Sequence, residues 1–166
     1  MINVALLGFG RIGQMHAQNI YLNKTLNLLY VYEKIDKLRK KAKNLYNCKI
    51  EKDYKKIFSD EKVDIIFISS PTNTHIRFIE EGIKYNKTIF CEKPLDLNIN
   101  KIVKTFKKVK KNKSKIQMGF NRRFDPSHHS IKKDLEKGKI GRLEKIIITS
   151  RAVSYTHLTL PTMIGV

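Results

Sequence analysis

The start of the chain decides its fold, and it runs Ile2-Asn3-Val4-Ala5-Leu6-Leu7-Gly8-Phe9-Gly10-Arg11-Ile12-Gly13. A largely apolar run leads directly into the glycine pattern G-x-G-x-x-G, and an amphipathic stretch follows. Such a run is typical of a strand buried on both faces of a parallel sheet. The stretch therefore predicts a strand, a tight glycine turn, and a helix whose free N–H groups can bind a diphosphate.

Each glycine of this turn has its own expected role. Gly8 permits the tight turn, Gly10 lets the backbone approach a diphosphate, and Gly13 allows the helix to pack closely on the strand. We expect all six residues of the turn to contribute to a dinucleotide site, including Phe9, Arg11 and Ile12. A glycine turn in a flavodoxin-like sheet that binds no nucleotide is the alternative.

An acidic residue lies where a second strand should end. Glu33 follows Gly13 by 20 residues. Its carboxylate can accept both ribose hydroxyls of NAD and would repel the 2′-phosphate of NADP. The sequence therefore favours NAD as the cofactor, although the adjacent Lys34 weakens the distinction.

The first 120 residues alternate short apolar runs with amphipathic stretches, as a parallel sheet covered by helices does. We expect strands at residues 2–7, 26–32, 48–50, 63–69, 88–91 and 116–120. We expect helices at residues 12–21, 34–46, 54–58, 76–85 and 100–111. This order predicts the α/β class, a doubly wound parallel sheet of the Rossmann type.

The pattern changes after Phe120. A polar stretch at 121–129 precedes an expected helix at 131–137 and one long expected strand at 143–150. We interpret residues 1–120 as a Rossmann domain and residues 121–152 as the truncated start of an α+β substrate and oligomerisation domain. A lone strand leaves backbone groups unpaired, so we expect aggregation or disorder beyond Phe120.

Residues 153–166 differ in composition from everything before them. They contain no Lys, Arg, Asp or Glu in a chain that is 30% charged. A translated transposon-end sequencing adapter would give the run from Val153 to Thr162, so we expect the genuine sequence to end at Arg151. A Thr-rich strand and turn is the alternative.

The composition also bears on partners and location. The chain carries 34 Lys and Arg against 15 Asp and Glu, a formal charge of +19. The lysines are spread along the chain with few aromatics between them, which favours solvated helix faces over a specific nucleic-acid site. Nucleic-acid binding through the lysine runs is the alternative. No apolar run is long enough for a membrane span and no signal peptide is evident, so we expect a cytoplasmic protein.

Cys48 and Cys91 suit neither a disulfide framework nor a metal site.

Polar residues follow the fourth and fifth expected strands, at the edge where open parallel sheets bind ligands. Those that we assign to the cofactor are Ser70, Pro71, Asn73, His75, Glu92 and Lys93. For His75, a contact to the cofactor and a role at the helix entry both stay open. His16 is assigned to packing, and His128 and His129 to the solvent-facing surface.

Lys93 is the candidate catalytic residue. An ammonium at a strand end can polarise a substrate hydroxyl and stabilise the alkoxide that forms as hydride leaves. Its neighbours, Glu92 and the rigid Pro94, support that role. An ordinary surface lysine is the alternative.

Together these motifs resemble the Gfo/Idh/MocA oxidoreductases. The resemblance rests on the three glycines with His16, on the Ser-Pro run that ends at His75, and on Glu92-Lys93-Pro94. The segments at residues 117–126, 138–141 and 148–151 are similar to members that oxidise inositol.

The resemblance implies a two-domain, homo-oligomeric enzyme that uses NAD to oxidise the 2-hydroxyl of myo-inositol, or another cyclic polyol or sugar. It implies that Lys93 is catalytic, that its bond to Pro94 is cis, and that Lys93 and Arg122 contact the substrate. The Asp and His of the family's proton relay lie beyond this sequence, so we expect the chain alone to be inactive. A dinucleotide-binding module without catalysis is the alternative.

Overall fold

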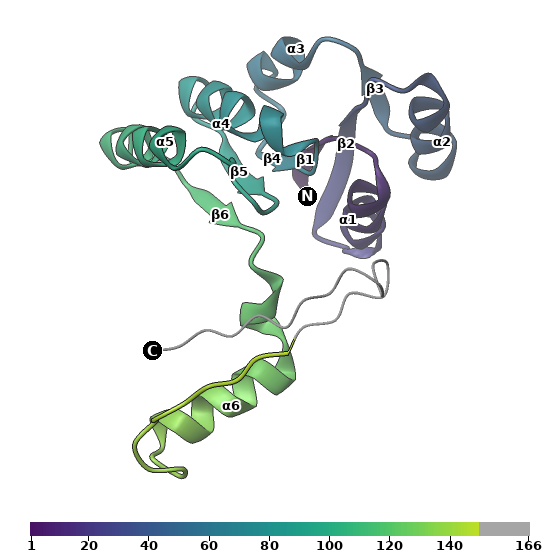
Figure 1. Cartoon of the computed structure of the whole chain (residues 1–166). Coiled ribbons are helices and arrows are strands. Elements are labelled where there is room, and N and C mark those ends of the chain that lie inside the picture. The colour runs from purple at the N-terminus through teal and green to yellow at the C-terminus, as the bar shows by residue number, and fades with distance from the viewer. Residues whose placement is uncertain (150–166) are drawn as a thin grey trace. The chain divides into compact units, whose positions relative to one another are not determined.

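The computed structural model describes residues 1–149 of the chain (Figure 1). It divides into two compact units, Met1–Phe120 and Asn121–Val166, and each is considered by itself. The interpretation of residues 153–166 as a translated adapter falls outside the described residues.

The first unit is built on a six-stranded sheet in the order β3-β2-β1-β4-β5-β6. The strands are β1 (Ile2–Leu7), β2 (Leu26–Tyr32), β3 (Lys49–Glu51), β4 (Ile65–Ile68), β5 (Thr88–Cys91) and β6 (Ile116–Met118). Every neighbouring pair is parallel. The expected doubly wound sheet is confirmed, and its strand order reverses between β1 and β4, where such sheets bind ligands.

Five helices connect these strands: α1 (Arg11–Leu22), α2 (Asp36–Tyr46), α3 (Tyr54–Ser59), α4 (His75–Lys84) and α5 (Ile99–Lys111). Side chains cap two of them, since Asp53 accepts from the Lys55 N–H and Asn98 accepts from the N–H groups of Asn100 and Lys101. Within residues 1–149, no helix is long and apolar enough to cross a membrane.

The core has two halves, one on each face of the sheet. Figure 1 shows α3, α4 and α5 on one side of the sheet and α1 and α2 on the other. Alternate residues of β1 supply the two halves: Ala5 and Leu7 pack with α3 and α4, and Val4 and Leu6 pack with α1 and α2. All four side chains are fully buried, because successive residues of a strand point to opposite faces.

The second unit differs from the sequence expectation in two places. Its helix α6 (Pro126–Glu136) starts five residues before the expected 131, because Asp125 accepts from the N–H groups of Ser127 and His128 and Pro126 fits the first helical position. Hydrogen bonds from the His128 side chain and N–H lower the pKa of the Asp125 carboxyl to about 2.

The expected strand at 143–150 is wrong for residues 143–149, which form no strand. A strand is stabilised by hydrogen bonds to a neighbour, and the described part of the second unit offers none. Ser150 lies outside the described residues.

The two-sided core predicts a specific stability difference. Leu6→Ala should lower the free energy of unfolding by about 2–5 kcal/mol, because it empties a fully buried site in the central strand. Leu22→Ala is the matched control, since Leu22 is exposed at the end of α1. Urea denaturation followed by circular dichroism measures both, and equal losses would contradict the assignment of Leu6 to the core.

Candidate functional site

The turn between β1 and α1 is held by two close approaches of backbone to backbone. Gly8 has φ +97°, and a β-carbon there would lie 2.7 Å from Cα of Ser70. At Gly13 a β-carbon would lie 2.1 Å from the Gly8 carbonyl oxygen. Gly8 thus makes the turn and Gly13 lets α1 pack against it, which are the roles expected from the spacing.

Gly10 differs from these two glycines. A β-carbon at Gly10 would meet nothing within 4 Å, so the space in front of this residue is open. Gly10 directly precedes α1, whose first N–H groups lack partners inside the helix. An open backbone at a helix N-terminus is the geometry that a diphosphate requires.

Glu33 is fixed beside this turn by backbone donors. Its Oε2 accepts from the N–H of Phe9 at 2.7 Å, and its Oε1 accepts from the N–H groups of Lys34 at 2.7 Å and Ile35 at 3.0 Å. Arg39, which sequence reasoning missed, donates to the Glu33 carbonyl at 3.0 Å. The carboxylate therefore stands at the end of β2 in a defined orientation.

The other residues of the turn divide by exposure. The Phe9 side chain is fully buried and packs edge-on against Tyr46, so only its backbone faces the turn. Arg11 and Ile12 are exposed on the first turn of α1.

The loop after β4 presents some of the expected residues and buries one. Pro71 and Asn73 are exposed, and Ser70 is half-buried with its Oγ 2.6 Å from Oγ1 of Thr74. His75 is only 1% exposed, at the start of α4.

Both ring nitrogens of His75 face carbonyl oxygens, with Nδ1 2.8 Å from that of Pro94 and Nε2 2.8 Å from that of Ser70. Of the two roles left open, these contacts support the one at the helix entry.

The loop after β5 places Lys93 at the surface. The Lys93–Pro94 peptide bond is cis, as the resemblance implies. Lys93 is exposed, and its N–H donates to Oε2 of Glu92 at 3.2 Å.

His16 does more than the expected packing. Its ring meets Phe67 and Phe90 edge-on, and its Nε2 lies 2.8 Å from Oε1 of Glu92. No spacing in the sequence signals this pair, whose members are 76 residues apart.

Arg122 belongs to the second unit. Its side chain is 69% exposed and lies 3.3 Å from Oδ2 of Asp125. His128 and His129 are exposed, as expected.

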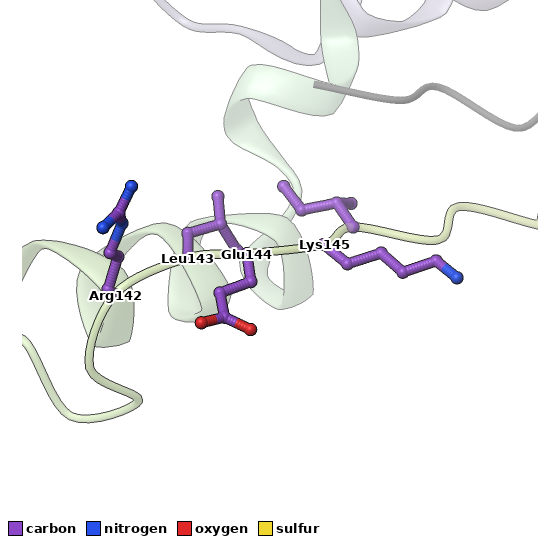
Figure 2. Close-up of a pocket in the computed structure, with 5 residues that line it drawn as sticks. Arg142, Leu143, Glu144 and Lys145 are labelled. Atoms are coloured by element: carbon purple, nitrogen blue, oxygen red, sulfur yellow. The ribbon is translucent and has the colours of Figure 1, made fainter.

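A shallow hollow in the second unit lies along residues 142–146, where Arg142, Leu143, Glu144 and Lys145 project from an extended segment (Figure 2). It gathers no set of converging polar groups. Within residues 1–149, no cluster of His, Cys, Asp and Glu could hold a metal ion.

Both cysteines are inert parts of the core. Burial raises the pKa of the Cys48 thiol to about 11 and that of the Cys91 thiol to about 12. Neither forms the thiolate that nucleophilic or metal-binding chemistry needs near neutral pH.

Residues 2–120 match the family model described as the oxidoreductase family with an NAD-binding Rossmann fold, Gfo/Idh/MocA. The chain belongs to the Gfo/Idh/MocA oxidoreductase family. Its NAD-binding Rossmann fold agrees with the glycine turn and the position of Glu33.

Several relatives of the chain are inositol dehydrogenases. The chain is 35% identical over 150 residues to inositol 2-dehydrogenase of Rhizobium meliloti, covering 90% of this chain and 45% of that protein. It is 35% identical over 152 residues to myo-inositol 2-dehydrogenase of Thermotoga maritima, again covering 90% and 45%. The chain thus spans less than half the length of these relatives.

The fold matches solved structures of the same group. The crystal structure of scyllo-inositol dehydrogenase from Lactobacillus casei, with bound NAD(H) and scyllo-inositol, superposes with a TM-score of 0.83 at 30% identity. The match covers 87% of this chain and 43% of that one.

The glycine turn predicts different effects of two similar substitutions, one on NADH binding and one on stability. Gly10→Ala should leave the thermal midpoint nearly unchanged and weaken NADH binding about tenfold, because its methyl group enters the open space where we expect the diphosphate. Gly13→Ala should lower the thermal midpoint, because its methyl group collides with the Gly8 carbonyl. NADH fluorescence titration and thermal denaturation separate the two, and normal NADH affinity in a folded Gly10→Ala chain would contradict the site.

Proposed function

We propose that this chain is the cofactor-binding half of an NAD-dependent dehydrogenase that acts on a ring hydroxyl of a cyclic polyol, with myo-inositol 2-dehydrogenase as the specific activity. One observation carries the proposal: the open backbone at Gly10, the fixed carboxylate of Glu33 and the exposed Lys93 all follow the carboxyl ends of strands of one parallel sheet, β1, β2 and β5. The inositol dehydrogenases among the relatives support the substrate class.

The residues around the glycine turn would hold the dinucleotide. The backbone from Gly8 to Gly13 faces the diphosphate, and the Glu33 carboxylate accepts the hydroxyls of the adenosine ribose. Ser70, Pro71 and Asn73 line the next strand end. When bound, NAD supplies the nicotinamide C4 that accepts the hydride.

Lys93 would act on the substrate oxygen. It follows β5, which is separated from β1 only by β4, so the residue lies at the same edge of the sheet as the glycine turn. A positive charge there stabilises the alkoxide that forms when the substrate hydroxyl gives its proton to the His implied by the family resemblance, before the carbinol carbon passes hydride to the nicotinamide and becomes a carbonyl. We also propose that Arg122 contacts the polyol in the whole protein.

The proposal concerns the whole protein. The chain by itself is proposed to be inactive, because the Asp and His that the family resemblance implies lie outside it. The whole protein is proposed to be a cytoplasmic homo-oligomer, with no specific nucleic-acid partner.

Replacement of Lys93 tests the chemistry. In the complete protein, Lys93→Ala should lower kcat for myo-inositol oxidation by about 100-fold or more while the Kd for NADH stays within about twofold, because the ammonium acts on the alkoxide and not on the diphosphate. Lys104→Ala, at an exposed position of α5, is the matched control. Unchanged kcat in Lys93→Ala would remove Lys93 from the reaction.

Replacement of Glu33 tests cofactor choice. Glu33→Ala should weaken NADH binding about tenfold and raise the affinity for NADPH relative to NADH, because the carboxylate that binds the ribose hydroxyls and repels a 2′-phosphate is gone. Isothermal titration calorimetry of both coenzymes with the 166-residue chain measures the ratio. An unaltered preference would show that Glu33 does not face the ribose.

A further inference from the structure

The side chain of His16 links two parts of the first unit that the sequence keeps far apart. His16 lies on α1, three residues after the last glycine of the turn, and Glu92 follows β5. His16 Nε2 donates to Glu92 Oε1 at 2.8 Å. The two side chains are 14% and 20% exposed, so water only partly screens the contact.

Aromatic rings fix the orientation of the imidazole. Phe67 of β4 and Phe90 of β5 stack on each other at 4.3 Å between ring centroids. His16 meets both edge-on, at 5.4 and 5.3 Å. These contacts leave Nε2 directed at the end of β5.

Glu92 is constrained from the other sides as well. Its Oε2 accepts from the Lys93 N–H at 3.2 Å. A β-carbon at Gly119 would lie 3.1 Å from Oε1 of Glu92, so the missing side chain at Gly119 makes room for the carboxylate. The Glu92 N–H donates to the Ile68 carbonyl at 2.9 Å. The carboxylate therefore joins α1 to the backbone of Lys93.

We propose that His16 is a positioning residue for the dehydrogenase reaction. Through its hydrogen bond to Glu92, it holds the loop after β5, which carries Lys93, in a fixed position relative to α1 and the glycine turn. The inference rests on the proposed function. It gives Glu92 a role between the two halves of the site, since one oxygen faces α1 and the other faces Lys93. His16 itself touches neither substrate nor cofactor in this scheme.

The test compares substitutions that separate the hydrogen bond from the packing. His16→Phe keeps an aromatic ring beside Phe67 and Phe90 and removes the donor, whereas His16→Gln keeps an N–H donor. In the complete protein, His16→Phe should lower kcat about tenfold, with the thermal midpoint and the Kd for NADH little changed, because small misplacement of a reacting group is costly. His16→Gln should recover most of the loss, and Gln18→Ala, on an exposed position of the same helix, is the control.

A double-mutant cycle checks that the effect passes through Glu92. If it does, His16→Phe combined with Glu92→Ala should have a kcat no lower than Glu92→Ala alone, because the two residues act as one unit. If the kcat of the double variant falls by the product of the two single losses, the inference is overturned. It is also overturned if His16→Phe loses kcat, NADH affinity and thermal midpoint together. Normal kcat in His16→Phe would overturn it and leave the proposed function standing. A wild-type protein that binds NADH but oxidises no polyol would instead refute the proposed function, and the inference with it.

Discussion

The close contact of α1 with the end of β1 is the constraint on which the rest of the first unit depends. The Gly8 carbonyl occupies the place where any side chain at Gly13 would begin. This contact brings the N-terminus of α1 to the switch point of the sheet, where the strand order reverses between β1 and β4. It also fixes the distance between His16 on α1 and the carboxyl ends of the strands. One helix thus has its first turn directly after Gly10 and contacts the end of β5 with its second turn, through His16.

Short polar contacts connect the segments that follow neighbouring strands of the sheet. Glu33 at the end of β2 bonds the backbone of the glycine turn, and Ser69 after β4 donates to the Gly8 carbonyl at 2.9 Å. His75 joins the loop after β4 to the loop after β5. Each loop is therefore tied to the next one across the sheet, and the exposed groups rest on a connected frame. Such a frame lowers the conformational freedom that a ligand would otherwise have to remove on binding.

Local sequence patterns were sufficient for the fold and for part of the site. Apolar runs and helical periodicity gave the six strands and five helices, and the spacing from Gly13 to Glu33 gave the acidic residue beside the turn. The bond from His16 to Glu92 could not be predicted, because it depends on which strands become neighbours. The strand expected at 143–150 failed over its described part for a related reason, since strand formation requires a partner. The early start of α6 was missed although Asp125-Pro126 is a local signal for a helix start.

The two buried cysteines make local opening of the first unit measurable. Cys48 belongs to the half of the core under α1 and α2, and Cys91 belongs to the half under α3, α4 and α5. Both thiols are shielded from solvent and protonated, so a thiol reagent can modify either one only after the layer above it has opened. The rates at which the reagent labels the two sulfurs therefore report separately on local opening of each side of the sheet, and no cysteine has to be introduced by mutation.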